Sequence, residues 1–213
     1  MDANYYKDKS VAYGMSHTRR SRILKLVGNP ENKKVLDIGC ASGYMGSRLK
    51  EAGAYVVGVD ISSKAIDIAK GRLNEAYLVE PGQILPPGNR DLFDIVLLTE
   101  VIEHIFDPIP ILSEIREHIN AGGFLIITTP NFMTWTNRLR FLFGNFRYAD
   151  QGMFDFGHIR WFTYQYLKEI IQKSGFKIEI EEHIIFPGKL TKVLKFWPSF
   201  FASQFVVKAR KAN

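Results

Sequence analysis

Residues 35–46, which read VLDIGCASGYMG, decide the fold of this chain. The apolar run from Val35 to Ile38 is typical of a short buried strand, and a turn of very small residues separates it from a helix that begins at Tyr44. Small side chains let a ligand approach the backbone, and the first turn of a helix offers unpaired N–H groups. The stretch therefore predicts a strand, a ligand-binding turn and a helix.

An acidic residue ends the next predicted strand. Asp60 follows Gly58-Val59 and lies 21 residues after Gly39. A carboxylate at this distance from a glycine-rich turn can accept hydrogen bonds from both hydroxyls of a ribose. We therefore expect a ligand that contains a ribose and lies across the carboxyl ends of the first two strands.

A dinucleotide is the first alternative ligand. Its fingerprint needs glycine at the first, third and sixth positions of the turn, which are here Gly39, Ala41 and Tyr44, so two of the three do not match. Asp37, just before the turn, suits an ammonium group better than a pyrophosphate. The residues favour a nucleoside that carries an amino acid.

Apolar runs and helical patterns alternate along most of the remaining chain. Helices are expected over 16–27, 44–52, 62–74, 107–120 and 164–174, and strands over 35–38, 54–59, 76–79, 93–99, 124–129, 176–185 and 204–210. The pair Gly122-Gly123 is expected to close the fourth helix. Near-continuous apolar strands separated by helices predict an α/β fold with a doubly wound, mostly parallel sheet. We expect one domain over 1–213, with a helical leader over 1–30 and an aromatic lid inserted after the fifth strand over 131–162.

Several of these stretches together resemble the class I S-adenosylmethionine-dependent methyltransferases. The resemblance is carried by residues 35–43, 58–60, 93–96 and 122–126. It implies a Rossmann-like sheet of seven strands whose last strand is antiparallel, and S-adenosylmethionine as cofactor. It also implies that Asp37, Gly39 and Gly43 hold the methionine end and Asp60 the ribose. Ala41 stands where the family commonly has a glycine.

Further candidates for cofactor contact are neighbours of these motifs. Glu80 is the nearest match to the acid that contacts adenine in the family. The others are Cys40, Ala41, Ile61, Thr99 and Glu100.

The segment 100–104, EVIEH, follows the predicted strand 93–99. If it is helical, Glu100, Glu103 and His104 share one face, and His158 in the lid is a fourth candidate. A similar Glu-x-x-Glu-His occurs in quinone O-methyltransferases and small-RNA 2′-O-methyltransferases, some of which use a metal, so a hard divalent cation such as Mg²⁺ or Mn²⁺ is one interpretation. The interpretation we favour has Glu100 lining the cofactor pocket and Glu103, His104 and His158 as the catalytic group, with His104 as general base and no metal ligand.

The lid has two interpretations. It is either a plain hydrophobic cover or an acceptor pocket made by Phe132, Trp135, Tyr148, Phe154 and Trp161. Residues 130–132, 135, 138–139 and 142–144 also resemble MetW of methionine biosynthesis, which acts with an acyltransferase partner.

The sequence therefore predicts a methyltransferase that acts on an oxygen of a small-molecule, glycan or lipid-linked acceptor. The alternatives are a MetW-like, partner-dependent protein and a metal-dependent RNA 2′-O-methyltransferase. The net charge of +6 permits anionic partners, but no RNA-binding module is recognised, so a nucleic-acid partner is not expected. The basic and aromatic stretch 190–207 suggests peripheral membrane contact, and its alternative is a packed connection into the last strand. A single cysteine and a polar start predict a cytoplasmic protein.

Overall fold

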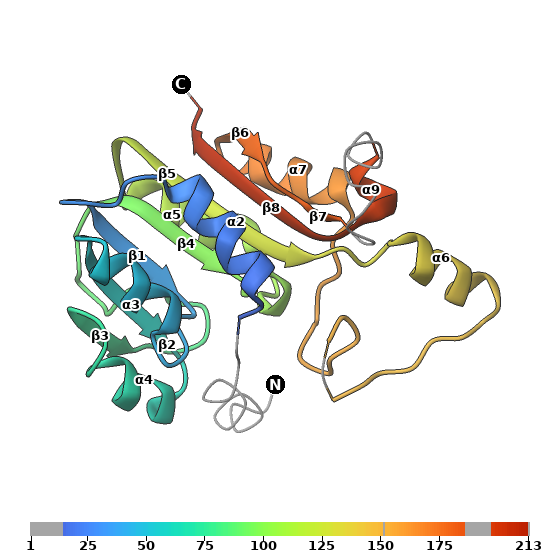
Figure 1. Cartoon of the computed structure of the whole chain (residues 1–213), viewed down its shortest axis with the longest axis horizontal. Helices are drawn as coiled ribbons and strands as arrows, with labels where there is room; N and C mark the ends of the chain where they lie inside the picture. The colour runs from blue at the N-terminus through green and yellow to red at the C-terminus, as the bar shows by residue number, and fades with distance from the viewer. Residues whose placement is uncertain (1–14, 151, 186–196, 213) are drawn as a thin grey trace.

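The computed structural model describes residues 15–150, 152–185 and 197–212 (Figure 1). Five parallel strands form the first part of its sheet, in the order β3-β2-β1-β4-β5. These strands are β1 (Lys34–Ile38), β2 (Tyr55–Asp60), β3 (Glu75–Leu78), β4 (Phe93–Thr99) and β5 (Ile119–Pro130). Because β1 lies between β2 and β4, the turn after β1 is at the point where the strand order reverses, which is the usual ligand site of such sheets.

The sheet is completed by antiparallel pairing. β8 (Ala202–Lys211) runs antiparallel to β5, and both β6 (Phe176–Glu181) and β7 (Ile184–Ile185) pair with β8. The predicted doubly wound, mostly parallel sheet with a reversed last strand is thus confirmed.

One predicted strand, 176–185, is divided into β6 and β7. The backbone N–H of Val206 in β8 donates to the His183 ring nitrogen Nδ1 at 3.2 Å, in place of a backbone carbonyl. The imidazole therefore interrupts the ladder between the two strands.

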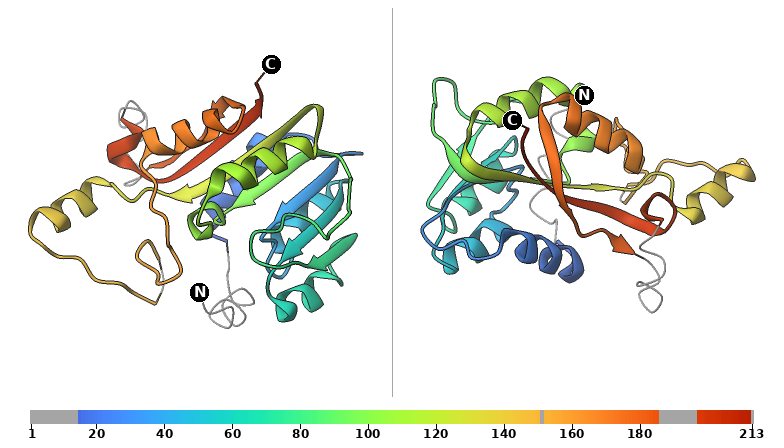
Figure 2. Two further views of the ribbon diagram at one scale, coloured as in Figure 1. Left: turned by 180° about the vertical axis from the view of Figure 1, so that it is seen from behind. Right: turned by 90° about the horizontal axis from the view of Figure 1, so that it is seen from above.

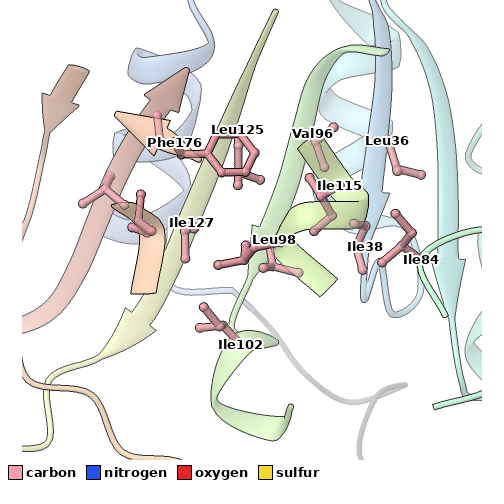
Figure 3. Packing of buried hydrophobic residues seen from close by; sticks show 14 of the residues in the cluster. Leu36, Ile38, Ile84, Val96, Leu98, Ile102, Ile115, Leu125, Ile127 and Phe176 are labelled. Atoms are coloured by element: carbon pink, nitrogen blue, oxygen red, sulfur yellow. The ribbon is translucent and has the colours of Figure 1, made fainter. Parts of the chain in front are cut away.

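Helices cover both faces of the sheet (Figures 1 and 2). One face is packed against α2 (His17–Val27), α3 (Tyr44–Glu51) and α4 (Ser63–Ala69). The other is packed against α5 (Pro108–Glu117) and α7 (Tyr164–Lys173). Figure 3 shows this second layer, where Leu36, Leu98 and Ile127 from three parallel strands lie on the side of the sheet that faces α5. All three are fully buried, so the central strands are covered on both faces.

Two predicted boundaries are wrong. The helix expected over 62–74 ends at Ala69, because Gly71 follows and Leu73 turns inward to pack close to Gly43 and Gly58. Gly122-Gly123 does not close a helix but lies inside β5, which begins at Ile119. Gly122 has φ +80°, and the pairing of β4 with β5 shifts register here, so the glycines form an irregularity of the strand.

The predicted lid leaves the sheet at the end of β5 and returns before α7. It carries α6 (Trp135–Leu142) and is closed at its base, where Asn131 pairs with Phe162 and the Phe132 N–H donates to the Phe162 carbonyl. Asn131 is fully buried and its amide donates to the Ala202 carbonyl at 2.7 Å. The two ends of the lid are therefore fixed to the sheet, and α6 extends outward (Figure 2).

The C-terminal stretch suggested for membrane contact is only partly described. Residues 190–196 lie outside the described residues, Trp197 is exposed, and α9 (Pro198–Phe201) leads into β8. Residues 204–207 are buried inside the sheet, as the alternative of a packed connection predicts. None of the described helices has the length and apolar character that a membrane crossing requires.

Candidate active site

The turn after β1 is shaped by three residues with positive φ. Gly39 (+70°) and Gly43 (+75°) use the freedom of glycine, and a Cβ on Gly39 would lie 2.3 Å from a methyl group of Val101. Ala41 also has a positive φ (+47°), which is costly for a residue with a side chain. Its N–H donates to Asp60 Oδ2 at 2.8 Å, and this hydrogen bond holds the turn in its strained form.

Asp60 joins the ends of β1 and β2. Besides Ala41, it accepts a hydrogen bond at Oδ1 from the Ser62 N–H at 2.9 Å, and Ser62 in turn caps α4. Burial raises the pKa of Asp60, and the backbone hydrogen bonds oppose that rise. Each carboxylate oxygen keeps acceptor capacity for a further donor, which is what a ribose hydroxyl needs.

Asp37 lies beneath the same turn. Its side chain is 1% exposed, and Oδ2 has no partner with hydrogen-bond geometry among the described residues. The pKa of Asp37 is raised to about 7, mainly by burial and secondly by the charge of Asp60. A hydrogen bond from the backbone of Gly46 opposes this rise. Two buried carboxylates next to one open turn form a site that suits a cation and disfavours a pyrophosphate.

The other predicted cofactor residues are placed differently. The side chain of Cys40 points into the core, where its Sγ would lie 2.8 Å from a Cβ on Gly58, so only its backbone faces the turn. Ile61 and Thr99 lie at the carboxyl ends of β2 and β4. Glu80 follows β3 and is exposed, and its backbone N–H is taken by the Gln83 side chain at 3.0 Å.

Glu100 does not share a helix face with Glu103 and His104. Only η1 (Ile102–His104) is helical. Glu100 precedes it with φ +57°, a left-handed backbone that directs its side chain away from those of Glu103 and His104. Its carboxylate pairs with Arg19 at 3.0 Å and accepts hydrogen bonds from the side chains of Thr128 and Gln204. Burial raises the pKa of Glu100, and Arg19 opposes that rise most strongly.

The residues around Glu100 were missed by the sequence reasoning. Arg19 comes from α2 and Gln204 from β8, and the Arg19 Nε donates to the Gln204 side chain at 2.8 Å. No short-range pattern links positions that are 185 residues apart. The pairing depends on α2 crossing the sheet beside β8, which the sequence does not show.

Glu103, His104 and His158 are brought together at the carboxyl edge of β4 and β5. Glu103 is 2% exposed, accepts from Thr129 Oγ1 at 3.1 Å, and has Oε1 4.0 Å from His158 Nε2. The two imidazole rings are 4.8 Å apart. Burial, and next the charge of Glu100, raise the pKa of Glu103 well above its ordinary value. The predicted proximity of these three side chains is therefore observed.

The hydrogen bonds of the two histidines define their neutral tautomers. His104 Nδ1 lies 2.8 Å from the Gly157 carbonyl and His158 Nδ1 lies 2.9 Å from that of Met153, so each Nδ1 carries a proton and donates it. In a neutral ring of this tautomer the lone pair is on Nε2. Burial lowers the pKa of His104 to about 4, so this ring is neutral at physiological pH.

The same cluster can be tested as a metal site. The ligand atoms of Glu103, His104 and His158 lie within 4.8 Å of one another. One carboxylate and two imidazoles suit Mn²⁺, Fe²⁺ or Zn²⁺ better than Mg²⁺, which prefers oxygen ligands. Glu100, the other oxygen ligand considered from the sequence, is held by Arg19 instead. The residues present therefore do not fit the magnesium interpretation well.

Four of the five predicted lid aromatics form one cluster. Phe132 stacks on Trp161 with ring centroids 4.7 Å apart, and Phe154 and Tyr148 lie against this pair. The buried Trp161 Nε1 has no hydrogen-bond partner in the part of the chain that the structure describes. Trp135 begins α6 and is half-buried. These four rings form an aromatic surface, called here the Phe132–Trp161 wall, that contains one unsatisfied hydrogen-bond donor.

The fold is that of the class I S-adenosylmethionine-dependent methyltransferases. Among solved structures, the magnesium protoporphyrin IX methyltransferase of Synechocystis, determined with bound SAH, has a TM-score of 0.69 and 16% identity, covering 99% of this chain and 98% of that one. A family model described as a methyltransferase domain matches residues 11–181, and the chain belongs to that family.

The curated proteins that the chain is similar to include ubiquinone biosynthesis O-methyltransferases. That of Coxiella burnetii is 36% identical over 106 residues, which are 47% of this chain and 45% of the relative. That of Nitrosomonas europaea is 29% identical over 118 residues, or 53% and 50%. The chain thus spans about half the length of the curated relatives it matches. The MetW-like and RNA-directed alternatives receive no support from these relatives.

Proposed function

We propose that this protein is an S-adenosylmethionine-dependent methyltransferase that methylates an oxygen of an apolar, aromatic small molecule. The observation that carries the proposal is the juxtaposition of two sites at one edge of the sheet. The turn with Asp37 and Asp60 lies at the ends of β1 and β2, and the cluster of Glu103, His104 and His158 lies beyond the end of the neighbouring β4. O-methylation needs a bound methyl donor and a group that accepts the proton of the acceptor oxygen. The first site would hold the cationic nucleoside, and the neutral His104 beside it would accept the proton.

The residues of the turn fit the cofactor. Asp60 would accept hydrogen bonds from the ribose, and the charge of Asp37 would favour the ammonium group of the methionine end. When bound, S-adenosylmethionine supplies an activated methyl group and a neutral leaving group. Because a neutral leaving group needs no protonation, the protein has mainly to align the acceptor and exclude water. The lid over 131–162 would do both, within a single domain over 1–213.

His104 is the base in this proposal. Because its Nδ1–H is donated to the Gly157 carbonyl, the lone pair of the neutral ring is on Nε2, the nitrogen that would take the proton. A ring with a lowered pKa is a weak base, so it suits a phenol, whose proton becomes acidic as the oxygen is methylated, better than an alkyl alcohol. His158, whose ring contacts that of His104, and Glu103, which lies beside His158, would hold the His104 ring in position.

The lid supports an aromatic acceptor. An acceptor ring could pack against the Phe132–Trp161 wall, and an acceptor oxygen would satisfy the Trp161 Nε1 donor. The names of the relatives, which refer to ubiquinone biosynthesis, agree with such an acceptor. Glycans fit less well, because the wall offers few polar groups.

The test is a turnover assay with methyl-labelled S-adenosylmethionine and three kinds of acceptor: alkyl-substituted catechols, sugar nucleotides and RNA. We expect release of S-adenosylhomocysteine with the catechols alone. Binding of the cofactor without transfer to any acceptor, together with co-purification of an acyltransferase, would favour the MetW-like alternative. Labelling of RNA that stops when a chelator is added would favour the RNA-directed one.

A further inference from the structure

The outer end of the lid exposes apolar side chains to an unusual degree. Leu142 and Phe143, at the end of α6, are 75% and 80% exposed. Leu139, earlier in α6, is 47% exposed, and Phe146, Tyr148 and Phe156 are partly exposed while their rings contact one another. A helix at a protein surface normally turns its apolar side inward, but the one residue of α6 that is buried is Asn137. Phe141 of α6 packs against Phe132 and Phe154, whereas Leu139 and Leu142 of the same helix are exposed.

Positive charge accompanies these side chains. Residues 135–149 include Arg138, Arg140 and Arg147 and contain no Asp or Glu. Arg140 and Arg147 are exposed. The guanidinium of Arg138 lies over the ring of Phe200 at 5.4 Å, which connects α6 to α9.

The neighbouring α9 extends the same surface. Phe200 stacks with Trp197, which is 62% exposed. Figures 1 and 2 show α6 at the end of the molecule, projecting beyond the sheet and the helices that cover it. We call the exposed side chains of Leu139, Arg140, Leu142, Phe143 and Arg147, with Trp197, the lid tip. Nothing in the described part of the chain covers it.

We propose that the lid tip binds the surface of an anionic lipid bilayer. Leu142 and Phe143 would enter the interfacial region, and the arginines would contact the lipid phosphates. The combination of protruding apolar side chains with arginines and no acid matches that surface. A second copy of the chain would bring the same positive charges face to face, which disfavours self-association. Lipid binding does not depend on the proposed methyl transfer.

The test is co-sedimentation of the full chain with vesicles. We expect the protein to sediment with vesicles of phosphatidylcholine and phosphatidylglycerol, to bind pure phosphatidylcholine much more weakly, and to be released by salt. The double variant Leu142→Ser/Phe143→Ser should weaken binding at least tenfold. The variant Arg140→Gln/Arg147→Gln should remove most of the preference for the anionic lipid.

The matched control is Ile68→Ser/Leu92→Ser, which removes two exposed apolar side chains elsewhere. It should bind vesicles like the parent, and all variants should keep the parent's melting temperature and cofactor affinity. Failure to sediment with the anionic vesicles, or equal losses in the control and the Leu142→Ser/Phe143→Ser variant, would overturn the proposal. So would light scattering that shows a dimer disrupted by the latter variant with lipid binding unchanged. A change in acceptor KM alone would assign the lid tip to the substrate instead.

Discussion

Replacing Asp37 by Asn should stabilise the ligand-free protein and at the same time weaken its binding of S-adenosylmethionine. The pKa of this carboxyl is raised from 3.8 to about 7, mainly by burial. A raised pKa means that the folded state holds a proton that the unfolded chain has released. The free energy of unfolding should therefore decrease as the pH rises from about 4 to 7, and the full decrease is reached above pH 7.

The magnitude follows from the shift. Three pKa units correspond to about 4 kcal/mol, an upper bound for the cost of an ionised Asp37 in the folded protein at pH 8. The amide of Asn is nearly the same size and carries no charge, so the Asp37→Asn variant should recover a substantial part of this energy. It also removes the negative charge under the turn, which should weaken cofactor binding at least fivefold, or about 1 kcal/mol.

The assays are urea unfolding at pH 5 and pH 8 and isothermal titration with S-adenosylmethionine. The stability gain should be clearly larger at pH 8 than at pH 5, because at pH 5 the folded wild-type carboxyl still keeps its proton. Asp67→Asn, in the exposed part of α4, is the control and should change neither quantity. An Asp37→Asn variant that is less stable than the wild type at pH 8, or that binds the cofactor equally well, would refute this account of Asp37.

Three further predictions concern the rest of the site. Asp60→Ala should weaken S-adenosylmethionine binding by at least about 1 kcal/mol in a calorimetric titration, because it removes charge-assisted hydrogen bonds; unchanged affinity would contradict the ribose assignment. His104→Gln should lower kcat about a hundredfold and change cofactor affinity less than threefold, and equal losses in both would exclude its role as base. Since its folded-state pKa is lowered to about 4, wild-type stability should decrease as pH falls from 6.5 to 4, and this variant should show less of that decrease. Arg19→Met should lower the free energy of unfolding by about 3 kcal/mol, because it leaves Glu100 buried without its cation, and adding Glu100→Gln should restore most of the loss; a loss that the second change does not reduce would show that the pair is unimportant.

The sheet was predictable because its signals are local. Continuous apolar runs such as Phe93–Thr99 define buried strands, and the small residues between Ile38 and Tyr44 define the turn. Ser16, Ser62, Asp107 and Thr163 cap their helices as their residue types suggest. These features each depend on a few neighbouring residues.

The site was predictable only in part, because some of its contacts are long-range. The approach of His158 to Glu103 and His104 follows from where the lid leaves and rejoins the sheet, and it was expected. The departure of Glu100 from this group was not, since it depends on a left-handed backbone at one residue and on Arg19 from another layer. The exposure of Leu142 and Phe143 at the end of α6 was also not expected, because a pattern of Leu and Phe ordinarily indicates the core.

The most direct measurement of the central claim is a competition between ligands for the turn after β1. S-adenosylmethionine and S-adenosylhomocysteine should bind the wild-type protein with micromolar affinity and should bind Asp60→Ala much more weakly, whereas NADH and ATP should bind neither. Binding of NADH or ATP that displaces S-adenosylmethionine, or that depends on Asp60 in the same way, would contradict the account.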